Sequence, residues 1–192
     1  MERKTLDYYA TPPSVSLALR DWMVANTLLN SNDPFLDPSA GDGAIIRAFR
    51  DASRLSEAHW SAIEIDSSHL GSLQETAHRV FIADALATDW FPANVIANPP
   101  FRGLDQFWQK IARHRATYKK WCACLVPTAW WHAQKRREYV RPDFILALGW
   151  RPSFLLDGGR PRNGTQDYSW CVLAPREKSI TRWERIEKPL QF

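Results

Sequence analysis

Short apolar segments alternate with helical patterns along this chain, and that alternation is the feature that most constrains its fold. In residues 104–115, for example, Leu104, Phe107, Trp108 and Ile111 form one apolar stripe at helical spacing. Strand–helix alternation predicts an α/β fold, with a mostly parallel sheet and helices on both faces. The predicted strands are residues 35–37, 61–65, 80–83, 95–97, 122–126, 144–148 and 168–173. The predicted helices are residues 44–52, 69–77, 104–115 and 131–140, after a first helix with its N-cap at Thr11.

The bulk properties are those of a soluble globular protein. We expect a single domain over residues 1–192, because the chain contains no repeat, low-complexity tract or linker. No apolar run is long enough to cross a bilayer and no secretory signal is evident, so we predict a cytoplasmic protein without a membrane partner. Cys122, Cys124 and Cys171 are expected to be reduced structural thiols, and no ligand spacing suggests a metal site.

Charge is distributed unevenly along the sequence. Residues 1–100 carry 7 Lys and Arg against 13 Asp and Glu, whereas residues 101–192 carry 18 against 8. The second half therefore has a net charge of +10, which would attract a phosphate backbone. An ordinary solvated surface explains the same numbers. The 10 tryptophans are expected mostly in the core, although some could stack on bases.

The residues most able to bind a ligand follow the predicted strands, because ligands of open α/β sheets bind at the carboxyl ends of strands. The first strand runs into residues 37–43 (Asp-Pro-Ser-Ala-Gly-Asp-Gly), a tight turn whose glycines let a ligand approach the backbone. A third glycine and a Gly-Lys-Ser/Thr sequence are absent, which disfavours dinucleotide and ATP binding. Glu64 ends the second strand and could accept hydrogen bonds from a ribose, and Asp84 follows the third. Each acid could instead cap a helix.

The fourth strand ends in Asn98-Pro99-Pro100-Phe101, the most specific motif of the chain. The prolines stiffen the backbone and remove two N–H donors, leaving carbonyl groups to accept. The Asn98 oxygen and the Pro99 carbonyl could grip an amino group by both hydrogens and turn its lone pair toward an electrophile. Such catalysis works by orientation and electrostatics. Phe101 could stack on the ring that carries the amino group; a simple proline-rich turn is the alternative.

These motifs resemble those of the class I, Rossmann-like, S-adenosylmethionine-dependent methyltransferases, and among them the N6-adenine DNA methyltransferases of the gamma motif order. Residues 8–13 (Tyr-Tyr-Ala-Thr-Pro-Pro) resemble the N-terminal cofactor segment, residues 37–43 the glycine motif and residues 98–101 the catalytic motif. The resemblance covers residues 8 to about 128 and continues more loosely to residue 172. It implies a seven-stranded, mostly parallel sheet with an antiparallel last strand, and transfer of a methyl group to adenine N6 in DNA.

The resemblance also assigns roles to individual residues. Catalysis falls to Asn98, Pro99, Pro100 and Phe101. The residues implied to bind S-adenosylmethionine are Tyr9, Thr11, Pro12, Asp37, Ser39, Gly41, Gly43, Glu64, Ile65, Asp84, Ala85 and Asn98. Members of the family flip the target base out of the duplex, which implies an aromatic sandwich. The residues proposed to contact the substrate are Phe101, Phe154, Arg136, Arg160 and Arg162.

The chain departs from the family in leaving almost no room for a separate target-recognition domain. The segments that could replace one are residues 129–143 and the glycine- and arginine-containing connection at residues 157–167. We therefore expect short or relaxed specificity, or a second subunit that supplies it. Small stand-alone enzymes of this appearance are typical of phages and prophages, where broad adenine methylation would mask DNA from restriction.

Four alternatives use the same motifs. An RNA adenine methyltransferase would have an indistinguishable site, since only a contact with the 2′-hydroxyl differs. A protein glutamine methyltransferase would usually have tyrosine in place of Phe101, and a cytosine amino methyltransferase more often has serine or aspartate in place of Asn98. An inactive nucleic-acid-binding module would keep the fold without turnover. A homo-oligomer is possible, although the sequence gives no sign of one.

Overall fold

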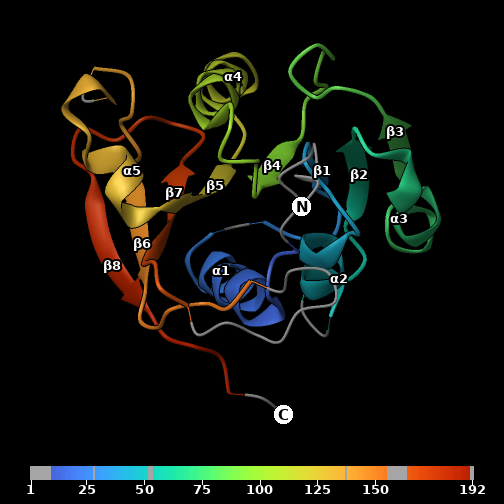
Figure 1. Ribbon diagram of the computed structural model, residues 1–192, viewed down its shortest axis with the longest axis horizontal. Coiled ribbons are helices and arrows are strands. Elements are labelled where there is room, and N and C mark those ends of the chain that lie inside the picture. Colours follow the sequence, from blue (N-terminus) through green and yellow to red (C-terminus); the bar gives the residue numbers. More distant parts are fainter. Residues whose placement is uncertain (1–9, 28, 52–53, 137, 155–163, 191–192) are drawn as a thin grey trace, which may run out of the picture.

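The computed structural model describes residues 10–27, 29–51, 54–136, 138–154 and 164–190. These residues build one sheet of eight strands with helices on both faces (Figure 1). The strand order is β3-β2-β1-β4-β5-β7-β6-β8. The strands are β1 (Pro34–Asp37), β2 (His59–Glu64), β3 (Arg79–Ile82), β4 (Asn94–Ala97), β5 (Cys122–Pro127), β6 (Phe144–Leu148), β7 (Tyr168–Leu173) and β8 (Arg182–Ile186).

Most neighbouring strands in the sheet are parallel. Among the described strands, β7 alone runs antiparallel to its neighbours, β5 and β6. The expected α/β sheet is thus confirmed, but it contains an eighth strand that the sequence did not predict. This strand, β8, pairs in parallel with β6 at the edge of the sheet. Four of its five side chains are wholly or partly exposed, so it lacks the buried apolar run that marks the central strands.

The helices divide into two groups, one on each face of the sheet (Figure 1). The first face is covered by α1 (Pro13–Asn26), α2 (Ala44–Arg50) and α3 (Leu70–Thr76). The second face is covered by α4 (Leu104–Tyr118) and α5 (Thr128–His132). Short 3₁₀ turns, η1 (Ser67–His69) and η2 (Gln134–Arg136), complete the helical elements of the described residues.

Two predicted helix features are wrong. Residues 131–140 do not form one helix, because α5 ends at His132 and Ala133 adopts an extended conformation. The chain turns there so that Arg136 reaches back to Trp130 and to Asp105 on α4. The N-cap of α1 is Pro12 rather than Thr11, whose side chain makes no capping hydrogen bond. The Thr11 hydroxyl instead accepts a hydrogen bond from the Asn98 amide at 3.0 Å.

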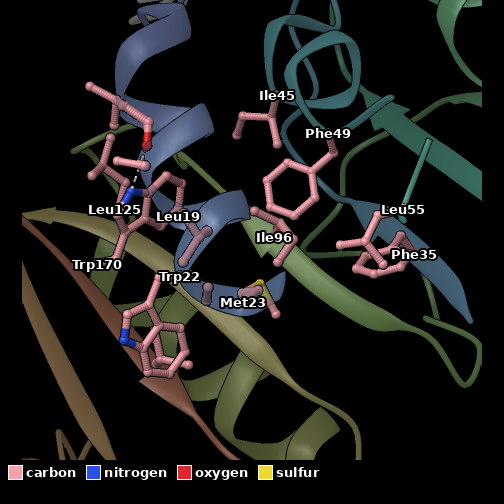
Figure 2. Packing of buried hydrophobic residues seen from close by; sticks show 14 of the residues in the cluster. Leu19, Trp22, Met23, Phe35, Ile45, Phe49, Leu55, Ile96, Leu125 and Trp170 are labelled. Atoms are coloured by element: carbon pink, nitrogen blue, oxygen red, sulfur yellow. Dashed lines mark hydrogen bonds between the residues drawn. The ribbon is translucent and has the colours of Figure 1, made fainter. Parts of the chain in front are cut away.

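Aromatic side chains fill much of the core between α1, α2 and the sheet. Phe35 stacks on Trp60 with ring centroids 4.8 Å apart, and Phe49 packs edge-on against the same indole at 5.4 Å. Figure 2 shows Trp170 under α1, where its indole N–H donates to the Val15 carbonyl at 3.1 Å. This bond ties β7 to α1 and satisfies the buried donor, as a tryptophan in a core requires.

The connection from β3 to β4 is the most unusual crossover of the sheet. Residues 83–93, all described by the structure, form turns and extended chain but no helix. The outer strand β3 consequently leaves Phe81 and Ile82 partly exposed.

No helix in the described part of the chain is long and apolar enough to span a membrane.

Candidate active site

The strand order reverses between β1 and β4, and a cavity lies at the carboxyl ends of these strands. Their ladder stops at the pair Leu36–Val95, so the two strand ends are free to diverge. Such a switch point is where open α/β sheets bind ligands. The cavity measures about 220 Å³. It is lined by Ala10, Thr11, Pro38, Ser39, Ala40, Gly41, Asp42, Ala44, Ile45, Glu64, Ile65, Asp66, His69, Ala83, Asp84, Ala85, Leu86, Asn98, Pro100, Arg102 and Phe107.

The glycine loop after β1 forms one wall of this cavity. Gly41 has φ +53°, in the left-handed region, and its N–H donates to the Glu64 carboxylate at 2.7 Å. Gly43 has φ +86° and does not line the cavity. A Cβ at Gly43 would come within 2.6 Å of the Thr76 hydroxyl, so this glycine serves the close packing of α2 on α3.

Glu64 sits at the carboxyl end of β2 with both of its oxygens oriented by backbone donors. One oxygen accepts from Gly41 N, and the other accepts from Asp66 N at 2.9 Å. A carboxylate has about four acceptor sites, so each oxygen keeps capacity for one further donor. The carboxylate is therefore held rigidly at the cavity wall, in the way that recognition of a pair of hydroxyl groups requires.

Asp37 is completely buried beneath the glycine loop and does not line the cavity. Burial raises the pKa of its carboxyl group to about 8, and the hydrogen bond from Ser39 N at 3.1 Å opposes that rise only in part. Its second oxygen has no hydrogen-bond partner among the described residues. Asp37 therefore supports the loop from below, and its burial favours the protonated form of the carboxyl group.

Two further polar groups border the cavity. The Ser39 hydroxyl is buried and has no partner among the described residues, which leaves a donor and acceptor for a ligand. Asp84, exposed after β3, accepts from Leu86 N at 2.8 Å through one carboxylate oxygen. Between them Ile65 presents an apolar surface, with 54% of the residue exposed.

Asn98 joins the end of β4 to the first turn of α1. Its amide nitrogen donates to the Thr11 hydroxyl at 3.0 Å. Because the two atoms of a primary amide diverge, this bond fixes the direction in which the amide oxygen points. Thr11 is buried and Asn98 half-buried, so the pair is protected from competition by water. Asn98 thus presents a pre-oriented acceptor at the cavity.

Phe101 lies outside the cavity and contacts an aromatic residue that the sequence did not single out. Its ring, 39% exposed, stacks on Tyr168 with centroids 6.2 Å apart and an interplanar angle of 27°. Phe154 contacts the same tyrosine at 4.8 Å, with a tilt of 54°. Phe101 and Phe154, both proposed from the sequence to contact the substrate, therefore both pack against the ring of Tyr168. Tyr168 begins β7, and only the order of the strands in the sheet shows that it lies beside the catalytic motif.

Arg136 is engaged inside the protein. Its Nε donates to Asp105 at 2.7 Å, its Nη2 to the same carboxylate at 3.3 Å, and its Nη1 to the Trp130 carbonyl at 3.0 Å. The guanidinium also lies over the Trp130 ring at 4.8 Å. Three of its five N–H groups are used, so the predicted contact with substrate would have to use the other two.

The cavity brings together eight of the residues assigned to a cofactor from the sequence: Thr11, Ser39, Gly41, Glu64, Ile65, Asp84, Ala85 and Asn98. Pro12, Asp37 and Gly43 support this wall without lining it. Tyr9, Arg160 and Arg162 lie outside the described residues. His69, Arg102 and Phe107 line the cavity unpredicted. Arg102 directly follows the catalytic motif. Of these three residues, it alone could have been identified from the sequence, by this position.

Known proteins resemble this chain in structure. The sequence matches no protein-family model and no curated protein. A class I S-adenosylmethionine-dependent methyltransferase from Listeria monocytogenes superposes with a TM-score of 0.64 at 15% identity, over 91% of this chain and 65% of the other. The type I restriction-modification methyltransferase subunit from Streptococcus thermophilus gives 0.60 at 15%, over 95% and 48%. The 23S rRNA methyltransferase ErmE gives 0.53 at 13%, over 86% and 71%.

The protein therefore has the Rossmann-like class I methyltransferase fold. It spans about two thirds of the Listeria chain and about half of the Streptococcus chain. At these identities the likeness establishes the shared architecture, and the chemistry has to be argued from the site. Among the described residues, no group of three or more His, Cys, Asp or Glu side chains could hold a metal ion.

Proposed function

We propose that this protein transfers a methyl group from S-adenosylmethionine to the N6 amino group of adenine in DNA, with short or relaxed sequence specificity. The observation that carries the proposal is Asn98, held by Thr11 at the wall of the switch-point cavity and followed by two prolines. The same motif in an ordinary turn would need neither a cavity nor a fixed amide.

Four residues of the cavity wall suit the parts of S-adenosylmethionine. Glu64 keeps acceptor capacity for the two ribose hydroxyls, and Ile65 offers an apolar surface to the adenine ring. The unpartnered hydroxyl of Ser39 suits the polar groups of the methionine part. Asp84, beside Ile65 at the end of β3, suits the amino group of the cofactor's adenine.

The residues of the catalytic motif would act on the amino group of the substrate. When bound, S-adenosylmethionine supplies a methyl group on a positively charged sulfur, and its transfer to the amino nitrogen leaves a thioether and releases one proton to water. The Asn98 oxygen and the Pro99 carbonyl accept from the two amino hydrogens and draw the lone pair out of conjugation with the ring. Neither group is a base, so the catalysis is chiefly orientation.

The choice of a nucleic acid as substrate is supported by charge and by aromatic side chains. The half of the sequence after residue 100 carries a net charge of +10. Phe101 and Tyr168 place two nearly parallel rings next to the catalytic motif, and a flipped base would stack on such a surface. A protein glutamine side chain has no comparable use for either feature.

The reaction itself tests the proposal. The protein is incubated with S-adenosylmethionine carrying a labelled methyl group and with plasmid DNA, RNA or protein in separate reactions. The labelled DNA is then digested to nucleosides, and N6-methyladenine is the expected product. Label found in RNA, in protein or in N4-methylcytosine would overturn the assignment of the substrate.

The role of Asn98 is tested by Asn98→Ala, which removes the amide and leaves the cavity otherwise intact. Turnover should fall about 100-fold or more, because the amino group loses its orientation. Binding of S-adenosylmethionine, measured by calorimetry, should remain measurable. Asn32→Ala, in an exposed turn before β1, is the matched control. Near-normal turnover of Asn98→Ala would contradict the role.

A further inference from the structure

A second hollow lies at the carboxyl ends of β6 and β8 and measures about 420 Å³. We call it the β6–β8 groove. It is lined by Ala147, Leu148, Gly149, Trp150, Arg151, Asp167, Trp183 and Arg185. Ala147 faces Arg185 in the β6–β8 ladder, and Gly149 lies under the pair formed by Arg185 and Glu187. The small side chains of Ala147 and Gly149 thus form a floor between larger cationic and aromatic walls.

The two arginines of the groove are exposed, and among the described residues each forms one surface ion pair. Arg151 Nε lies 2.8 Å from Asp167, and Arg185 Nε lies 2.8 Å from Glu187. All four side chains are more than half exposed, so water screens both pairs and they add little to stability. A phosphate group binds a guanidinium with two parallel hydrogen bonds and can exchange for either carboxylate. Both cations are therefore available to a polyanion.

A tryptophan stands beside these cations with much of its ring in water. Trp183 is 54% exposed, and its inner part packs against Trp131 with centroids 5.5 Å apart. An exposed indole next to arginines is the combination that binds single-stranded nucleic acid, where bases stack on aromatic rings and phosphates pair with cations. Trp183 and Arg185 both lie on β8, the strand added beyond β6.

The groove and the catalytic motif lie along the same edge of the sheet. Strands β4, β5, β6 and β8 all run in the same direction, so their carboxyl ends lie along the same side of the sheet. Asp167, which lines the groove, is followed directly by Tyr168, whose ring contacts Phe101. From β4 to β8 there are four inter-strand steps, or about 19 Å at the usual strand spacing. A few nucleotides would bridge that distance.

We propose that the β6–β8 groove binds the nucleic-acid strand that continues from the target base, with Trp183 stacking on a flanking base and Arg151 and Arg185 contacting phosphates. This inference rests on the proposed function, since it takes the target base to lie beside Phe101. It gives the chain a substrate-binding surface within the catalytic domain, built on the additional strand.

Binding of labelled oligothymidylates that contain one adenine tests the groove by fluorescence anisotropy. A 4-mer and a 12-mer are compared for the native protein, Trp183→Ala, Trp183→Phe, and the double variant Arg151→Ala/Arg185→Ala. Arg182→Ala is the control, an exposed arginine at the amino end of β8 that does not line the groove. Trp183→Ala should weaken binding of the 12-mer about tenfold, and Trp183→Phe should restore most of that loss.

Salt dependence separates the stacking of bases from the pairing of phosphates. The double arginine variant should lower the slope of log affinity against log salt by about 1.4, or about 0.7 for each phosphate that is no longer neutralised. Trp183→Ala should leave that slope unchanged, and Arg182→Ala should bind as the native protein does. Unchanged affinity for the 12-mer in both groove variants would overturn the inference. The absence of methyl transfer by the native protein would instead refute the proposed function, because the binding measurement needs no turnover.

Discussion

At the scale of single residues, Thr11 and Asn98 form a pair that links the first turn of α1 to the end of β4. Thr11→Val removes the hydroxyl that accepts from the Asn98 amide and keeps the volume of the side chain. The hydrogen bond that orients the amide is then lost, at a net cost of about 0.5–1.5 kcal/mol, so kcat should fall by up to about tenfold. Thr11→Ser keeps the acceptor and should retain most of the activity. Equal kcat values for Thr11→Val and the native protein would show that the bond does not position Asn98.

Asp37 makes the stability of the protein depend on pH. Its pKa is about 8 in the folded protein, against 3.8 for the free side chain, because burial disfavours the charged form. Between these two values the folded state retains a proton that the unfolded state has released. The free energy of unfolding should therefore fall as the pH rises from about 4 to 8, by at most about 1.4 kcal/mol per pH unit from this residue.

The variant Asp37→Asn isolates that contribution, because the amide is nearly isosteric and does not ionise. Urea unfolding at pH 5 and pH 8 gives the comparison. The stability of Asp37→Asn relative to the native protein should increase from pH 5 to pH 8. A difference that stays constant over this range would mean that Asp37 is already ionised in the folded protein at pH 5.

At the scale of elements, the junction of α2 and α3 depends on one glycine. Gly43→Ala places a Cβ 2.6 Å from the Thr76 hydroxyl, in a left-handed conformation, and should cost about 1–2 kcal/mol or more of stability. Gly71→Ala is the matched control, since nothing lies within 4 Å of the added Cβ and the residue is inside helix α3. That control should stabilise the protein by up to about 1 kcal/mol. Thermal unfolding of both variants checks the two signs, and destabilisation by Gly71→Ala would contradict this interpretation.

The two strands that the sequence predicted most accurately are largely buried. β6 and β7 match the prediction residue for residue, and the other predicted strands are displaced by one or two residues at their ends. Two buried faces require a continuous apolar run, which is legible without a structure. β8 has no such run, and the turn after His132 depends on the contact of Arg136 with Asp105 on another helix. Interactions between elements determine both features, so local patterns did not reveal them.

At the scale of the whole molecule, the three thiols report on the integrity of the fold. Cys122, Cys124 and Cys171 are buried and free, as the sequence predicted, and burial raises the pKa of all three. Iodoacetamide reacts with thiolates, so the native protein should take up essentially no label at neutral pH. Unfolding in urea should expose all three together, which mass spectrometry would count. Modification of a single thiol under native conditions would indicate local opening of the sheet at β5 or β7.

The candidate site was predictable in part because chain order determines which strand ends meet in a parallel sheet. Glu64, Asp84 and Asn98 follow different strands, and the rule for switch points brings them to one cavity. Tyr168 could not be found in this way. Tyr168 begins the antiparallel strand β7, and the amino end of this strand, rather than its carboxyl end, lies beside the catalytic motif. The opposite direction of β7 was expected, but its register against β5 was not.

The connection between β3 and β4 contains no helix, and this bears on the side from which a cofactor would leave the cavity. Residues 83–93 contain no helix, and Ile65 and Asp84, which line the cavity at the ends of β2 and β3, are exposed to water. The β6–β8 groove lies at the other end of the same edge. We therefore expect spent cofactor to leave by one side while the polymer stays held at the other. Under the proposed function, we expect successive adenines on one strand to be methylated processively, without dissociation between cycles.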